Sequence, residues 1–188
     1  RSGGAYRKNL AAFDTTIDTN NATPWKSDVV GVCDIDYGCG YVKSLLYSGT
    51  SLYVAGFFDR VSNTVRNSIA KVNTTVNTGN LLAWNPSAPS ARIQVMTLDG
   101  TSLYVGGAFT NIGGAARNGI ARLDTTVDTN NADAWNPNAT FNYFSNGVEA
   151  ILIDGSQAYV SGSFSNIGGQ ARTNIARLDT LTDTNNAD

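Results

Sequence analysis

Histidine is absent from the 188 residues of this chain, and its absence excludes several classes of active site. Ser-His-Asp catalysis, Cys-His catalysis and His-ligated zinc all depend on it. The commonest general base near neutral pH is missing for the same reason. We identify no catalytic residue, so we predict a protein that is not an enzyme and that needs no cofactor, with calcium considered below.

Charged residues are also scarce, at 15% of the chain against about a quarter in typical globular proteins. The 13 lysines and arginines are scattered and the net charge is −2, so no basic stripe could neutralise phosphates. No run approaches the roughly 20 apolar residues that span a bilayer. We therefore expect neither a nucleic-acid partner nor a membrane span. No secretory signal is present, but the chain opens within a motif, so we expect its true start to lie upstream.

Asparagine, threonine, glycine, serine and aspartate take the place of the missing charge. These residues favour turns and short strands over helices. Only one glutamate, Glu149, is present, which also argues against long solvated helices. Hydrophobic residues make up 41% of the chain, enough to bury a core. The composition therefore predicts an all-β protein.

A repeated motif runs along the whole chain. The segment NIGGAARNGIARLDTTVDTNNADAW starts at Asn111, close copies start at Arg1 and Asn166, and a divergent copy starts at Arg60. One position of the motif is always arginine, with spacings of 59, 51 and 55 residues: Arg7, Arg66, Arg117 and Arg172. We divide the chain into unit 1 (1–25, partial), unit 2 (26–84, with a cysteine-containing insertion at 31–41), unit 3 (85–135) and unit 4 (136–188, truncated).

Each unit is predicted to form four short antiparallel strands. In unit 3 they are delimited by the alternation of apolar residues, by the turn pair Asp99-Gly100 and by a break in the chain at Gly113-Gly114. The expected strands are Ile93–Leu98, Ser102–Phe109, Gly119–Asp124 and Ala132–Trp135. Four strands in units of about 51–59 residues are typical of a β-propeller blade. We predict a β-propeller that is partial or open in this chain.

The repeated residues resemble those of the delta-sixty-type β-propeller repeats of bacterial secreted and surface proteins. The similarity is carried by YVGGAFTNIGG and RNGIARLD in unit 3. The double glycine followed by a tryptophan also resembles a kelch blade. This resemblance implies the propeller fold and an extracellular or cell-surface location, and it assigns no activity.

Several repeated residues are expected to be architectural. Small pairs such as Gly106-Gly107 should allow a neighbouring sheet to approach closely. The phenylalanines and tryptophans should fill the space between blades. The four arginines should each make an ion pair or a carbonyl contact, and only a surface shared by all units would make them functional. The phenylalanines and tryptophans concerned are Phe58, Phe109, Phe164, Trp25, Trp84 and Trp135.

The loop DTNNAD could bind calcium, because it places oxygen ligands at near-alternate positions. The candidate ligands in units 3 and 4 are Asp128, Asn130, Asp133, Asp183, Asn185 and Asp188. Units 1 and 2 depart from the pattern and no bidentate glutamate follows. Asx side chains that close their own turns explain the same residues, and we favour that explanation.

Four aromatic residues outside the repeated core could form a platform for a sugar ring. They are Tyr37, Tyr41, Tyr143 and Phe144, within the variable segments 31–41 and 141–147. Partial burial between blades is the alternative. Cys33 and Cys39 are expected to form a disulfide in an oxidising compartment, or else to be two buried thiols. Asn21, Asn73 and Asn138 begin glycosylation sequons, which would make the protein a glycoprotein.

The first and last units are in the same phase of the repeat, so they duplicate each other. Propellers need about four blades to remove exposed edges. We therefore expect a fragment of a longer propeller, or a chain whose edges are covered by other copies or by cell-envelope and extracellular components. The predicted function is an extracellular structural and interaction module. A lectin-like propeller that binds carbohydrate or another ligand through its variable loops is the alternative.

Overall fold

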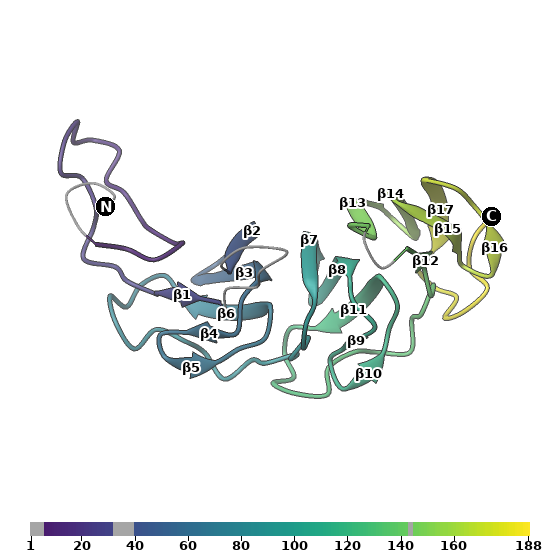
Figure 1. The fold of residues 1–188 in the computed structure, drawn as a ribbon, viewed down its shortest axis with the longest axis horizontal. Coiled ribbons are helices and arrows are strands. Elements are labelled where there is room, and N and C mark those ends of the chain that lie inside the picture. The colour runs from purple at the N-terminus through teal and green to yellow at the C-terminus, as the bar shows by residue number, and fades with distance from the viewer. Residues whose placement is uncertain (1–5, 32–39, 143–144) are drawn as a thin grey trace.

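The computed structural model describes residues 6–31, 40–142 and 145–188, and this part of the chain contains strands and turns but no helix. It therefore contains no helix that could cross a membrane. Three main sheets, one for each of units 2 to 4, lie side by side along an open arc (Figure 1). The all-β prediction and the prediction of an open propeller-type array are confirmed.

Each main sheet has three antiparallel strands, with the second strand in the centre. The strands are β2 (Tyr41–Ser48), β3 (Ser51–Phe57) and β6 (Ile69–Asn73) in unit 2; β7 (Arg92–Asp99), β8 (Ser102–Ala108) and β11 (Ile120–Asp124) in unit 3; and β13 (Val148–Asp154), β14 (Gln157–Gly162) and β17 (Ile175–Asp179) in unit 4. The first two strands of each unit are joined at a tight turn. In unit 3, Gly100 takes a left-handed φ of 57° there, which glycine adopts without strain.

The predicted fourth strand is present as a single antiparallel bridge in each unit. In unit 3, Ala132 bridges to Leu123, and Val72–Leu81 and Leu178–Ala187 are the equivalent bridges in units 2 and 4. The ladder does not extend toward Trp135, because the Asp133 carboxylate accepts the Trp135 N–H at 3.0 Å and closes a local turn instead. Side-chain bonds of this kind compete with a strand ladder.

Short strands beside the main sheets form a second set of small sheets. They are β1 (Val29–Val30), β4 (Arg60–Val61) and β5 (Thr64–Val65); β9 (Asn111–Ile112) and β10 (Ala115–Ala116); and β12 (Thr140–Phe141), β15 (Phe164–Ile167) and β16 (Gln170–Ala171). In units 2 and 4 the segment that enters the unit pairs with the hairpin, as β1–β4–β5 and β12–β15–β16. The double glycine of the motif forms the hairpin turn, where Gly113 and Gly114 have φ of 62° and 79°.

The hydrophobic core lies between units. One buried cluster combines Tyr53, Ile69 and Trp84 of unit 2 with Ile93 and other residues of unit 3. A second cluster joins unit 3 to unit 4 in the same way, and a third packs the N-terminal segment on unit 2. The repeated phenylalanines and tryptophans are all at most 6% exposed within these clusters, which confirms that they fill the space between units.

The repeated small pair in the central strand has two different roles. A Cβ on Gly106 would lie 2.7 Å from a methyl of Val148 in the next unit, so the predicted close approach of a neighbouring sheet is confirmed there. A Cβ on Gly107 would instead lie 2.3 Å from the Arg92 carbonyl oxygen within the same sheet. The register between β7 and β8 shifts at this point, between Ile93 and Val95. The second glycine therefore accommodates an irregularity in its own ladder.

Candidate functional site

A tryptophan joins each unit to the next one. The Trp84 ring lies edge-on to Tyr53 of its own unit, with 5.3 Å between ring centroids. Its Nε1–H donates to the backbone carbonyl of Asp124 in unit 3 at 3.1 Å. Trp135 repeats both contacts, with Tyr104 at 5.3 Å and the Asp179 carbonyl at 3.0 Å. Both tryptophan side chains are therefore used in contacts within their own unit and with the next unit.

The repeated arginines bind backbone carbonyls. Arg66 donates to the carbonyl oxygens of Val65 at 2.9 Å and Leu82 at 3.0 Å. Arg117 donates to Ala116 at 2.8 Å and to the Asp133 carbonyl, and Arg7 makes the same pair of contacts in unit 1. The expected carbonyl contact is confirmed for these three. Each guanidinium ties the loop before the third strand to the bridge segment that follows it.

We expect Arg117→Ala to lower the free energy of unfolding by about 2 kcal/mol. A hydrogen bond from a charged donor contributes roughly 1.5–3 kcal/mol, and solvent screening reduces the contribution of the two bonds of this half-buried guanidinium. Arg172 provides the control, since its bond to Ala171 is 3.3 Å long and no second carbonyl bond is found in the described residues. Arg172→Ala should cost less than about 1 kcal/mol. Urea denaturation of both variants measures the difference, and equal losses would contradict the two-carbonyl role.

The acidic residues of the predicted calcium loop are partly committed elsewhere. Asp133 pairs with Arg122, and Asp188 pairs with Arg177 at 2.5 Å. Asp128, Asn130, Asp183 and Asn185 have exposed side chains in the turn. No group of three or more acidic or thiol side chains that could hold a metal is found in the described ranges. Calcium binding by these loops stays a prediction.

A different asparagine closes these turns. Asn131 is 3% exposed, and its Nδ2 donates to the Val127 carbonyl at 3.1 Å. Asn186 repeats this contact with Thr182 at 3.0 Å. The Asx explanation named Asp128, Asn130 and Asp133; the turn is closed instead from Asn131, one position after Asn130, while Asp133 accepts the Trp135 N–H. Sequence reasoning missed it because Asp128, Asn130 and Asn131 all satisfy the same pattern.

The carboxylate at the end of the third strand is used by a local turn as well. Asp124 accepts the Thr126 hydroxyl at 2.6 Å and the Thr126 N–H at 2.8 Å. These two bonds hold the pKa of Asp124 below its ordinary value. Asp14 and Thr16 repeat the arrangement in unit 1, with the same effect on the pKa of Asp14. A carboxylate held ionised in this way is poorly suited to act as a general acid.

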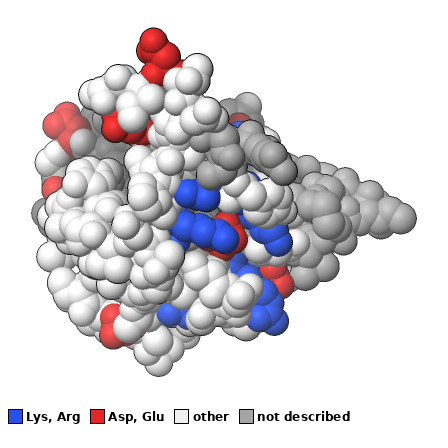
Figure 2. All heavy atoms as spheres, turned by 90° about the vertical axis from the view of Figure 1, so that its left-hand side faces the viewer, with Lys and Arg blue, Asp and Glu red and all other residues white. Residues whose placement is uncertain are grey.

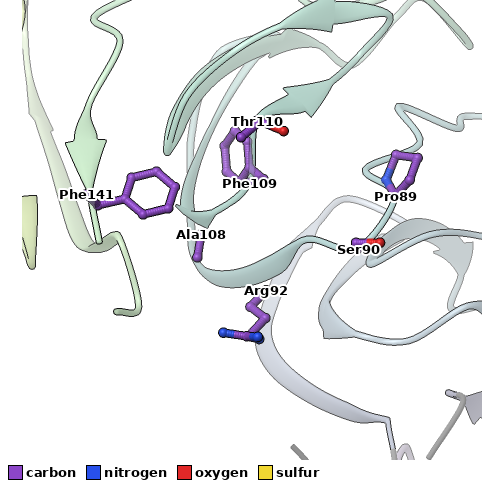
Figure 3. Close-up of a pocket in the computed structure, with 7 residues that line it drawn as sticks. All are labelled: Pro89, Ser90, Arg92, Ala108, Phe109, Thr110 and Phe141. Atoms are coloured by element: carbon purple, nitrogen blue, oxygen red, sulfur yellow. The ribbon is translucent and has the colours of Figure 1, made fainter. Parts of the chain in front are cut away.

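The variable connections contribute to a cavity of about 150 Å³ at the junction of units 3 and 4. Figure 3 shows the Phe141 ring directed from β12 toward Ala108 and Phe109 of unit 3, with Arg92 below them. The cavity is lined by Pro89, Ser90, Arg92, Ala108, Phe109, Thr110 and Phe141. Two aromatic rings, two hydroxyl groups and a guanidinium are thus brought together. Such a set can stack on an apolar face and donate hydrogen bonds to oxygen atoms.

The structure places only one of the four predicted ligand-binding aromatics. Tyr41 is half-buried and its ring is tilted by 46° against Phe57, at 6.1 Å. Tyr37, Tyr143 and Phe144 lie outside the described residues. Phe141 falls within the predicted variable segment and lines the cavity, whereas Arg92 and Phe109 were missed. Phe109 is one of the repeated core residues, so the sequence suggested only a packing role for it and not that it also lines the cavity.

The remaining predicted positions concern covalent chemistry. Cys33 and Cys39 lie outside the described residues. Asn138 is exposed, with a left-handed φ of 53°. Asn21 and Asn73 are half-buried, and the Asn73 side-chain oxygen accepts the Thr75 N–H at 2.8 Å. Among the three sequons, Asn138 is therefore the most accessible to a glycosylating enzyme.

Comparison with known families gives one match. Residues 102–126 and 159–180 match the model described as "Domain of unknown function (DUF5122) beta-propeller". The two segments occupy corresponding positions in units 3 and 4, from the central strand to the turn or the residue after the third strand. No curated protein and no solved structure matches the chain. The match supports a propeller-type fold and carries no activity with it.

Proposed function

We propose that this chain is a non-enzymatic structural and interaction module that is located outside the cell or at its surface. The observation that carries the proposal is how the repeated side chains are used. The repeated tryptophans and arginines, which a shared active site would require, bind backbone carbonyls within and between units. The repeat therefore serves to stack units, and contacts with partners fall to the edges and to the variable connections.

The composition supports a location outside the cell. The chain is rich in asparagine and threonine, poor in charge, and carries an exposed sequon at Asn138. Partners of such a module would be other copies of the chain or components of the cell envelope. Exposed apolar side chains give it surfaces for such contacts: Leu45, Tyr47, Leu152 and Ile175.

The location is tested on intact cells of the source organism. A membrane-impermeant amine label and protease treatment should reach the chain, and an antibody should stain cells without permeabilisation. A cytosolic protein serves as the control for lysis. Labelling that requires broken cells would contradict the proposed location.

The cavity between units 3 and 4 favours a second candidate function, which is binding of a carbohydrate. A sugar ring could stack on Phe141 while Arg92 and Thr110 donate to its hydroxyl or carboxylate oxygens. An acidic polysaccharide fits this set better than a neutral one, because of the guanidinium. The variable length of the connections would then set the specificity of the site.

We expect Phe141→Ala to weaken binding to an acidic polysaccharide by about two- to twelvefold, since loss of a stacked aromatic contact costs roughly 0.5–1.5 kcal/mol. Tyr47→Ala is the matched control, because Tyr47 is an exposed aromatic residue (67%) outside the cavity. Affinity electrophoresis in gels that contain acidic or neutral polysaccharide measures both variants. Equal retardation of the two variants, or no retardation of the wild type, would reject the cavity as a carbohydrate site.

A further inference from the structure

Two asparagines of the chain stand directly before glycine: Asn118-Gly119 in unit 3 and Asn146-Gly147 in unit 4. An asparagine in this position is prone to lose its side-chain amide, because glycine has no Cβ to shield its backbone nitrogen. Heat-stable proteins contain fewer such thermolabile residues. The two pairs share this chemistry, so their surroundings determine which of them reacts.

The Asn118-Gly119 pair is held by backbone hydrogen bonds on both residues. The Gly119 N–H donates to the Phe109 carbonyl at 3.0 Å, and the Gly119 carbonyl accepts the Gly107 N–H at 3.0 Å. The Asn118 carbonyl accepts the Ala139 N–H at 3.0 Å. Gly119 is also buried. Its nitrogen can approach the Asn118 side chain only after these bonds open.

The Asn146-Gly147 pair lies at the surface and is held less firmly. Asn146 is exposed, and no hydrogen bond of this residue is found in the described part of the chain. The Gly147 N–H has a long contact of 3.4 Å to the Ser145 hydroxyl. This distance lies outside the usual range of about 2.7–3.2 Å for such bonds. The Gly147 nitrogen is therefore less restrained than the Gly119 nitrogen.

Packing between units 3 and 4 requires glycine at position 147. Gly147 has a left-handed φ of 69°, and a Cβ there would collide with the Gly107 carbonyl oxygen of β8. The Gly147 carbonyl accepts the Ser163 N–H at 2.7 Å. Val148, the first residue of β13, is fully buried. The junction thus fixes a glycine directly after an exposed asparagine.

We propose that Asn146 is a site of spontaneous deamidation, at which the chain modifies itself between units 3 and 4. The Gly147 nitrogen bonds to the side-chain carbonyl carbon of Asn146, and the bond from that carbon to Nδ2 breaks. Ammonia leaves with the proton of the Gly147 N–H, and a five-membered succinimide ring remains. This inference goes beyond the proposed function and does not rest on it.

Water completes the reaction by opening the ring at either of its two carbonyl carbons. The hydroxyl of the water goes to that carbon, the bond from the carbon to the Gly147 nitrogen breaks, and the nitrogen regains a proton. The amide has then been exchanged for a carboxyl group, with no oxidant or reductant involved.

The two ring openings give different backbones. Opening at the side-chain carbonyl gives aspartate and leaves the backbone unchanged. Opening at the backbone carbonyl gives isoaspartate, whose main chain runs through the side chain and is longer by a methylene group. The extra length lies next to Gly147, which is packed on β8 and bonded to Ser163. Isoaspartate should therefore loosen the start of β13, whereas aspartate should only add charge.

Charged side chains are few, so the new carboxylate is easily detected. Figure 2 shows a face of the molecule on which uncharged residues predominate. Deamidation of Asn146 changes the net charge from −2 to −3, since one neutral amide becomes one carboxylate. The purified chain is incubated in mildly alkaline buffer made with heavy-oxygen water, and its charge forms are separated by ion exchange. Peptide mapping should find the heavy oxygen at Asn146, as aspartate and isoaspartate.

Asn118 is the internal control for this experiment. In the folded chain it should deamidate at least about tenfold more slowly than Asn146, because several backbone hydrogen bonds must open first. In guanidinium chloride, which unfolds both pairs, the two rates should become similar. Equal rates in the folded chain, or a folded Asn146 that stays intact while the unfolded one reacts, would overturn the proposal.

The variant Asn146→Gln keeps an amide but cannot form the five-membered ring. It should therefore lose the new charge form of the folded chain, while the slow reaction at Asn118 continues. Persistence of the same charge form in this variant would place the reaction elsewhere in the chain and would overturn the assignment to Asn146.

Hydrogen exchange tests the effect on the junction. In the isolated isoaspartate form the Ser163 N–H should exchange about two- to tenfold faster than in the wild type, the equivalent of one net hydrogen bond. Asn146→Asp is the matched control, because it adds the same charge and keeps the backbone length. Its Ser163 N–H should exchange as in the wild type. Equal exchange in the isoaspartate form and in Asn146→Asp would overturn the proposed loosening of β13.

Discussion

Replacement of Trp135 by alanine is expected to lower the free energy of unfolding by about 3–5 kcal/mol, the usual cost of removing a buried aromatic ring. Trp135 is fully buried, lies edge-on to Tyr104 and donates to the Asp179 carbonyl at 3.0 Å. The substitution thus removes contacts to unit 3 and unit 4 at once. Chemical denaturation followed by circular dichroism measures the loss.

Two further variants separate the parts of this effect. Trp135→Phe keeps most of the ring contact and removes the hydrogen bond, so it should cost about 1 kcal/mol for that bond, with a small packing loss. Trp25→Ala removes a ring that has the same carbonyl bond, to Asn73 at 3.0 Å, but no tyrosine partner in the described residues. Its cost should be smaller by roughly 0.5–1.5 kcal/mol, the value of an aromatic pair.

The loss in Trp135→Ala should also be local. Units contact mainly their neighbours, so stability in such arrays is close to a sum of unit and junction contributions. Hydrogen exchange should therefore accelerate in β13, β14 and β17 more than in β2, β3 and β6. Equal acceleration in all three sheets would contradict this description and would indicate one cooperative domain.

The strands of the main sheets were predictable because each is long enough for apolar alternation. The prediction for Ser102–Phe109 differs from β8 by one residue. The two-residue strands, such as β9 and β10, were not predicted, since two residues show no periodicity. Their hairpins are determined by the double glycine, which was identified only as a break in the chain. Fold class thus follows from composition and repeat, whereas the small sheets depend on turn geometry.

Burial was harder to predict than strand position. Alternation places Tyr104 on the face opposite Leu103 and Val105, which suggests exposure, yet Tyr104 is 3% exposed. Both faces of an inner sheet are covered because units stack on both sides. The same logic explains why the sequence could not show which of the repeated isoleucines are buried. Ile120 and Ile175 occupy the same position of the repeat, yet Ile120 packs against the neighbouring unit and is buried whereas Ile175 is 69% exposed.

The candidate cavity shows a third limit. The sequence pointed to the variable segment 141–147, and Phe141 lies in the cavity. Its other ring belongs to Phe109, a repeated core residue, and its cation belongs to Arg92 at the start of β7. A site formed by a variable loop on a repeated framework draws residues from both. Such sites are found by geometry and not by asking which residues depart from the repeat.

The second large effect is expected at Gly107. Gly107→Ala should lower the free energy of unfolding by at least about 3 kcal/mol, at the upper end of the cost of overpacking. The added Cβ would lie 2.3 Å from the Arg92 carbonyl oxygen and 2.9 Å from the Ile93 Cα. Both are backbone atoms of β7, so the strands must separate where their register shifts. Thermal and urea denaturation measure the loss.

Gly106→Ala is the matched control for this effect, at the adjacent position of the same strand. Its Cβ would meet side-chain methyls of Val148 and Val95 at 2.7 and 2.8 Å, and methyls can move aside. The equivalent position in unit 2 already carries Ala55, whereas the Gly107 position is glycine in units 2 to 4. Gly106→Ala should therefore cost less than about 1.5 kcal/mol. If the two substitutions cost the same, the backbone contact across β7 and β8 does not explain the repeated second glycine.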